Sequence, residues 1–218
     1  MNVRGWIRAC AVFTGALSLG GCGSLLETTL PAPQAYVLRL APQPTPAATG
    51  TSAGSVLVQR PEAGPGLDSD GIALLRSEQR FDFYAASRWA APTPDVVESL
   101  IIDALRGSGA FAAVFDDSSP YAPQYVLRVT LRRFEADYTK GGGAPMVHVA
   151  LDCTLGRHRD RALLASFTAQ GSAQAGEDRL NSVVAAFGTA ASAAMNELTQ
   201  AATAAVANEP PPAASAKK

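Results

Sequence analysis

The chain has 218 residues, 18 of them basic and 19 acidic, and its formal net charge is −1. This balance does not favour nucleic-acid binding, which needs a clustered basic surface. The length suits one domain with terminal extensions. Only three cysteines are present, Cys10, Cys22 and Cys153, and two of them lie near the N-terminus. We therefore expect a domain held by a hydrophobic core, without an internal disulfide.

Residues 1–21 have the layout of a secretory signal peptide. Two arginines precede an uncharged, mostly apolar run over 9–19, which matches a signal h-region and is too short to span a bilayer core. The run ends in Leu-Gly-Gly-Cys at 19–22, which resembles the lipobox of bacterial lipoproteins. We expect Cys22 to carry covalent diacylglycerol and N-acyl lipid, and we expect no other cofactor. An ordinary cleaved signal, or a short anchor helix, with an incidental cysteine is the alternative.

The sequence divides into four parts. After the signal peptide, residues 22–34 are expected to be a lipidated tether, 35–206 the folded domain and 207–218 a disordered, proline-rich tail. Gly23 follows the cysteine, where many inner-membrane lipoproteins have aspartate. We therefore expect an outer-membrane anchor facing the periplasm, with the inner membrane as the alternative. A tether of about 12 residues could span roughly 40 Å when extended.

Apolar patterning in the first half of the domain predicts short strands and one helix. Strands are expected over 35–40, 56–59, 72–76 and 80–85, the last half-buried because Phe81, Phe83 and Ala85 alternate with polar residues. Thr93 is the expected N-cap of a helix, with Pro94 at its first position. Apolar residues follow at helical spacing until Gly107 and Gly109, where the helix should end.

The second half predicts longer elements. The apolar phase of a strand over 125–138 slips after two arginines, which predicts a β-bulge near 132–134. An antiparallel hairpin over 147–169 and a helix over 177–206 follow. About six strands and two helices together predict an α+β two-layer sandwich, with a mostly antiparallel or mixed sheet and both helices on one face.

Motifs of catalysis are not found in the sequence. It has no Gly-rich phosphate loop, no G-x-S-x-G elbow and no H-E-x-x-H zinc helix, so we expect no enzyme and no metal site. His148 and His158 are expected to be exposed, and Asp116-Asp117 to form a loop. Cys153 should be a small core residue, because it alternates in phase with apolar neighbours.

Two short segments have alternative interpretations. The arginines within 157–161 are expected to form a solvated turn, with a contact to anionic lipid or a partner as the alternative. At Arg88-Trp89-Ala90-Ala91-Pro92, an arginine and an aromatic residue precede a proline. We expect Trp89 to pack the strand-to-helix corner beside Pro92, with Arg88 capping or pairing locally. The alternative is that Arg88, Trp89 and Pro92 contact a partner.

The order of these pieces resembles the ABC-type transport auxiliary lipoproteins, a PqiC-like family that accompanies MCE-type (mammalian cell entry) lipid transport systems. The resemblance covers about residues 35–205. It rests on AYVLRL at 35–40, the stretch that ends in R-W-x-x-P at 88–92, the helix that follows it and the strand at 125–138.

This resemblance implies a role without a reaction. Such a lipoprotein would work with an MCE-domain protein, an ABC permease and its ATPase to move phospholipids or other hydrophobic molecules. We expect a periplasmic adaptor that docks the MCE-domain protein to a membrane, and self-assembly into a homo-oligomer is compatible with this. One alternative is a lipid-binding carrier with a cavity between sheet and helices. Another is a structural lipoprotein that assists assembly of outer-membrane or secretion complexes.

Overall fold

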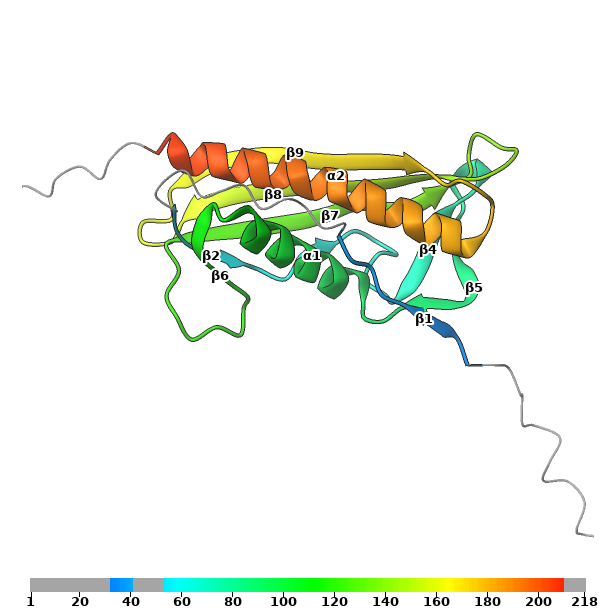
Figure 1. The fold of residues 1–218 in the computed structure, drawn as a ribbon, viewed down its shortest axis with the longest axis horizontal. Helices are drawn as coiled ribbons and strands as arrows, with labels where there is room; N and C mark the ends of the chain where they lie inside the picture. The colour runs from blue at the N-terminus through cyan, green and yellow to red at the C-terminus, as the bar shows by residue number, and fades with distance from the viewer. Residues whose placement is uncertain (1–31, 41–52, 210–218) are drawn as a thin grey trace, which may run out of the picture. The chain divides into compact units, whose positions relative to one another are not determined.

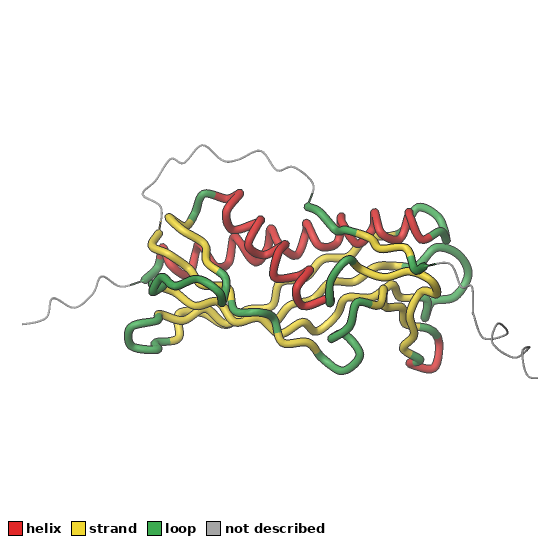
Figure 2. The backbone as a smooth tube through the Cα atoms, turned by 90° about the horizontal axis from the view of Figure 1, so that it is seen from below, coloured by secondary structure: helices red, strands yellow, loops and turns green. Residues whose placement is uncertain are grey.

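A single mixed sheet covered by two helices forms the domain (Figure 1). The computed structural model describes residues 32–40 and 53–209; the expected signal peptide, Cys22 and residues 210–218 lie outside this part. Both helices lie on the same side of the strands (Figure 2), so the predicted α+β sandwich is confirmed. The sheet of the described residues has nine strands, more than the six expected.

The long strand β7 (Tyr125–Asp137) organises the sheet. On one side it pairs antiparallel with β8 (Met146–Arg157) along nearly its whole length. On the other side it pairs in succession with three short parallel strands, β2 (Ala53–Val58), β3 (Glu62–Ala63) and β4 (Gly71–Leu75). One long strand therefore aligns three chain segments that are separated by loops.

The remaining strands extend the sheet outward. β9 (Leu163–Gln174) pairs with β8 and completes the predicted hairpin, whereas β6 (Phe111–Phe115) pairs with β2. β5 (Phe81–Trp89) lies between β4 and β1 (Gln34–Tyr36). β1 is shorter than the expected 35–40 strand, and no strand was predicted for β3 or β6.

A β-bulge in β7 confirms the predicted slip of the apolar phase. The β7–β8 register shifts between Leu131 and Arg133. The buried face passes from Leu131 to Phe134, which are 0% and 1% exposed. The slip keeps apolar side chains toward the helices on both sides of the bulge.

Helix α1 (Thr93–Ser108) begins differently from its prediction. Pro92 is the N-cap, and Thr93 is already helical. The Thr93 hydroxyl donates to the carbonyl oxygen of Ser69 at 2.9 Å, which anchors the start of the helix to the loop before β4. The predicted end is confirmed, because Gly109 caps the helix in the left-handed conformation, φ 64°.

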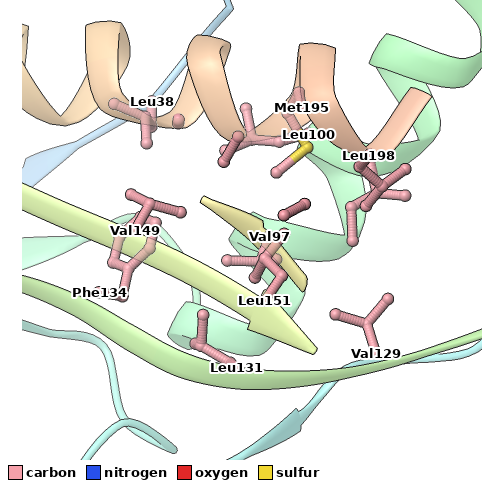
Figure 3. Close-up of a cluster of buried hydrophobic side chains, with 14 of the residues drawn as sticks. Leu38, Val97, Leu100, Val129, Leu131, Phe134, Val149, Leu151, Met195 and Leu198 are labelled. Atoms are coloured by element: carbon pink, nitrogen blue, oxygen red, sulfur yellow. The ribbon is translucent and has the colours of Figure 1, made fainter. Parts of the chain in front are cut away.

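Helix α2 (Leu180–Ala207) lies along β8 and β9 and closes the core. Its buried side is rich in alanine, so its backbone can approach the sheet closely. Figure 3 shows apolar side chains of the sheet meeting those of both helices. The labelled side chains of this core cluster are Leu38, Val97, Leu100, Val129, Leu131, Phe134, Val149, Leu151, Met195 and Leu198.

The face of the sheet opposite the helices, here called the open face, carries two aromatic rings. Phe81 and Phe83 are 37% and 41% exposed and contact each other edge-on at 5.5 Å. Phe81 pairs with Leu75 of β4, and Phe83 pairs with Ala73. Leu74, which lies between Ala73 and Leu75 in the strand, is buried on the helix side of the sheet. The alternation around 80–85 therefore marks a strand correctly, but its phenylalanines lie outside the core.

Candidate functional site

Trp89 lies at the corner where β5 leads into α1 and is fully buried. Its ring contacts Phe134 of β7 edge-on at 5.8 Å and Phe187 of α2 at 5.2 Å. Such edge-to-face pairs add to the free energy gained by burial alone. Trp89 thus joins the corner to the sheet and to the covering helix.

The backbone of this corner is held by the loop before β4. The Trp89 amide donates to the carbonyl oxygen of Asp70 at 2.7 Å. Arg88 Nη1 forms an ion pair with Asp70 Oδ2 at 3.0 Å, with both side chains about half exposed. Pro92 is exposed, and its carbonyl oxygen accepts a hydrogen bond from the Asp95 amide at 2.9 Å. The three predicted residues therefore come together, but only Arg88 and Pro92 are accessible to a partner.

A charged cluster lies on the open face beside the bulge. Glu135 is only 5% exposed and accepts hydrogen bonds from Arg133 Nε at 2.6 Å and from the Phe134 amide at 2.8 Å. His148, expected to be exposed, is half-buried, with its Nε2 3.8 Å from Asp137 Oδ2. Burial, together with the nearby Arg133 charge, lowers the pKa of His148. These groups largely satisfy one another, which indicates a structural role.

The other predicted residues are spread over the fold. Cys153 is buried in the core, as predicted, and burial raises its pKa to about 12. Asp116 and Asp117 follow β6 in a turn. Within residues 32–40 and 53–209, no group of three His, Cys, Asp or Glu side chains is placed to hold a metal ion. No helix in this part is long and apolar enough to cross a bilayer.

Comparison with known families identifies this fold. The sequence model of the ABC-type transport auxiliary lipoprotein component family matches residues 36–211. This chain belongs to that family, as its motif order predicted. No protein of curated function matches the sequence.

Solved structures resemble the domain over most of its length. XCC0632 from Xanthomonas campestris is 27% identical, with a TM-score of 0.66 over 80% of this chain and 94% of that one. An uncharacterized protein is 16% identical, with a TM-score of 0.59 over 78% and 97%. The hypothetical protein CT253 from Chlamydia trachomatis is 9% identical, with a TM-score of 0.51 over 72% and 100%. The latter two establish the shared fold alone.

Proposed function

We propose that this chain is a non-catalytic adaptor of an MCE-type ABC transport system for phospholipids or other hydrophobic molecules. Acyl chains on Cys22 anchor it in the outer membrane, and the domain faces the periplasm. There it docks the MCE-domain protein, which works with a permease and an ATPase. The energy of transport then comes from that ATPase.

The family match carries this proposal. It spans residues 36–211, which include nearly all of the described domain, so the auxiliary role belongs to the domain itself. Adaptor function needs an accessible surface, and the open face offers one that no described element covers.

The packed interior favours an adaptor over a carrier. A carrier of the kind considered above would hold lipid between the sheet and the helices. That space is occupied by buried side chains, the largest of which include Trp89, Phe134 and Phe187. Opening it would expose these rings to water, at a cost of roughly 2 kcal/mol for each.

Affinity capture tests the adaptor role. The full-length chain, tagged at its C-terminus, is recovered from gently solubilised membranes, and the co-purified proteins are identified by mass spectrometry. We expect an MCE-domain protein together with an ABC permease and ATPase. Secretin or barrel subunits without an MCE-domain protein would instead support the assembly role, and the proposal would then be wrong.

Lipid analysis of the same preparation separates adaptor from carrier. At high ionic strength, which weakens binding to exposed charges, native mass spectrometry should show the domain without a lipid beyond the acyl chains on Cys22. A stoichiometric co-purified lipid that survives both high salt and removal of the detergent would favour the carrier, because a lipid enclosed in the interior does not depend on exposed charges. Deletion of the gene, in a background without paralogues, should increase envelope permeability and alter lipid distribution.

A further inference from the structure

A pocket of about 430 Å³ opens on the open face at the end of the sheet where β9 begins. One row of cross-strand neighbours crosses it: Val126 of β7 pairs with Gly156 of β8, and Gly156 pairs with Leu163 of β9. Because Gly156 has no side chain, a depression forms on this face of the sheet between Val126 and Leu163.

Leu163 belongs to this pocket because of an irregular register. Leu155 pairs with Ala165, but the next residue, Gly156, pairs with Leu163, which leaves one extra residue in β9. Such a bulge turns a strand residue to the other face. Leu163 therefore lies on the open face, where it is 64% exposed. The pocket thus has an apolar wall that no described residue covers.

Positive charge surrounds this wall. Arg128 of β7 and Arg161 of the β8–β9 turn line the pocket, together with His158. Arg128 Nε donates to the Gln59 side-chain oxygen at 2.8 Å. Among the described residues, no carboxylate forms an ion pair with Arg128 or Arg161, and the pocket therefore has two uncompensated guanidinium groups.

Arg157, which also lines the pocket, provides a contrast. Its Nε lies 2.8 Å from a Glu209 carboxylate oxygen, and its Nη1 lies 3.3 Å from Asp160. Its charge is thereby balanced on the helix side of the sheet. The excess charge in the pocket is thus due to Arg128 and Arg161.

The backbone of Arg161 is strained. Its φ is +58°, in the left-handed region that glycine and asparagine adopt more easily than other residues. The turn therefore tolerates strain at the residue that brings an unpaired guanidinium to the pocket. Local strain of this kind often marks a functional position.

We propose that this pocket binds the phosphate group of an anionic amphiphile. Arg128 and Arg161 hold the phosphate oxygens through charge-assisted hydrogen bonds, and Val126 and Leu163 contact the adjoining apolar part. A phospholipid headgroup and a soluble phosphate ester share this chemistry. The pocket needs no MCE-domain partner, so this inference stands independently of the adaptor role.

Titration calorimetry of the full-length chain in an uncharged detergent tests the site. The probes are dihexanoyl phosphatidylglycerol, inorganic phosphate and uncharged dihexanoylglycerol. We expect saturable binding of the first probe, weakened about tenfold by Arg128→Gln or Arg161→Asn. Arg132→Gln is the matched control, since Arg132 lies exposed on the same face and is paired with Asp152 at 3.4 Å. The affinity of this variant for dihexanoyl phosphatidylglycerol should equal that of the native chain.

The stability of Arg161→Asn separates binding from folding, and one further variant, Leu163→Ser, separates lipid from free phosphate. Arg161→Asn should raise the Tm by about 2 °C, because asparagine tolerates a positive φ, so its lost affinity cannot reflect unfolding. Leu163→Ser should weaken the binding of the phosphatidylglycerol probe but not the binding of inorganic phosphate. Equal binding of both probes, unchanged by Leu163→Ser, would identify a soluble phosphate ester as the ligand.

The proposal is overturned by either of two results. One is the absence of saturable binding of both phosphate-bearing probes. The other is an equal loss of affinity for dihexanoyl phosphatidylglycerol in Arg128→Gln and Arg132→Gln. Neither result affects the capture of an MCE-domain protein, so failure of this site and failure of the adaptor role are distinguishable.

Discussion

Gly171 of β9 lies directly against the backbone of Ala190 in α2. A Cβ atom at position 171 would be 2.1 Å from the Ala190 carbonyl oxygen and 2.9 Å from the Ala194 amide nitrogen. The alanines on the buried side of α2 permit this approach, and the absence of a side chain at Gly171 completes it. The spacing between helix and sheet is therefore set by small residues on both sides.

Gly171→Ala should destabilise the domain by about 3 kcal/mol, because the new methyl group meets helix backbone that cannot yield without moving α2. Urea unfolding followed by circular dichroism measures this change. Gly107→Ala is the matched control. A Cβ at Gly107 meets nothing within 4 Å, and helix propensity favours alanine by up to about 1 kcal/mol. Equal effects of the two substitutions would contradict the close packing of α2.

Trp89 and its neighbour Arg88 should respond very differently to substitution. Trp89→Ala removes a fully buried ring that contacts Phe134 and Phe187, and we expect a loss of about 4 kcal/mol. Arg88→Gln removes a half-exposed ion pair with Asp70 and should change stability by less than about 1 kcal/mol.

The Arg88 variant also tests the corner as a partner contact. Because Arg88→Gln should keep the fold, its effect on capture of an MCE-domain protein reports contact alone. Arg132→Gln serves as the control, because Arg132 is likewise an exposed arginine paired with an aspartate, Asp152. A drop in capture for Arg88→Gln alone would place the docking surface at this corner, whereas no drop would limit the corner to structure.

The sequence predicted those features whose signal lies within a single segment. The bulge in β7 was visible because the apolar phase of one long strand slips next to Arg133. The helices were visible because their apolar residues repeat over several turns. β3 has only two residues, which is too short for such a pattern, and the five residues of β6 are all apolar, so no alternation of apolar and polar side chains marks it.

Features that depend on distant pairing could not be predicted. The sequence indicated a basic turn over 157–161, but Arg128 joins it only because β7 pairs with β8. The exposure of Leu163 depends on a register shift between β8 and β9. The contact of Gly171 with α2 likewise depends on how the helix crosses the sheet. Each of these is a property of strand or helix pairing rather than of local composition.

Cys153 should resist thiol reagents in the native state. Burial, with smaller contributions from Asp152 and Glu197, raises the pKa of its thiol to about 12. The reactive thiolate is therefore scarce at pH 8. Iodoacetamide labelling should be slow in buffer and fast in urea. Rapid labelling of the native chain at this site would contradict its burial.

The same shift gives a stability dependence on pH. The folded state keeps the Cys153 proton from about pH 9, the ordinary pKa of the thiol, up to about pH 12, whereas the unfolded chain loses it. The unfolded state then binds fewer protons, so the free energy of unfolding falls as the pH rises through this window. Cys153→Ala should show a shallower fall than the native chain when urea unfolding is repeated between pH 8 and pH 11.

The proposed lipid anchor on Cys22 predicts a residue-specific labelling result in cells. Cys22→Ser should abolish incorporation of a clickable palmitate analogue, because the serine hydroxyl cannot replace the thiol as acceptor of the diacylglycerol. Cys10→Ser is the matched control, since Cys10 lies within the apolar run of the expected signal peptide, and the labelling of this variant should be unchanged. Gly23→Asp should keep the label but move the chain to the inner-membrane fraction of a sucrose gradient. Persistent labelling of Cys22→Ser would show that the acyl chains are attached elsewhere, whereas a native chain without label would support a signal peptide of the ordinary cleaved kind.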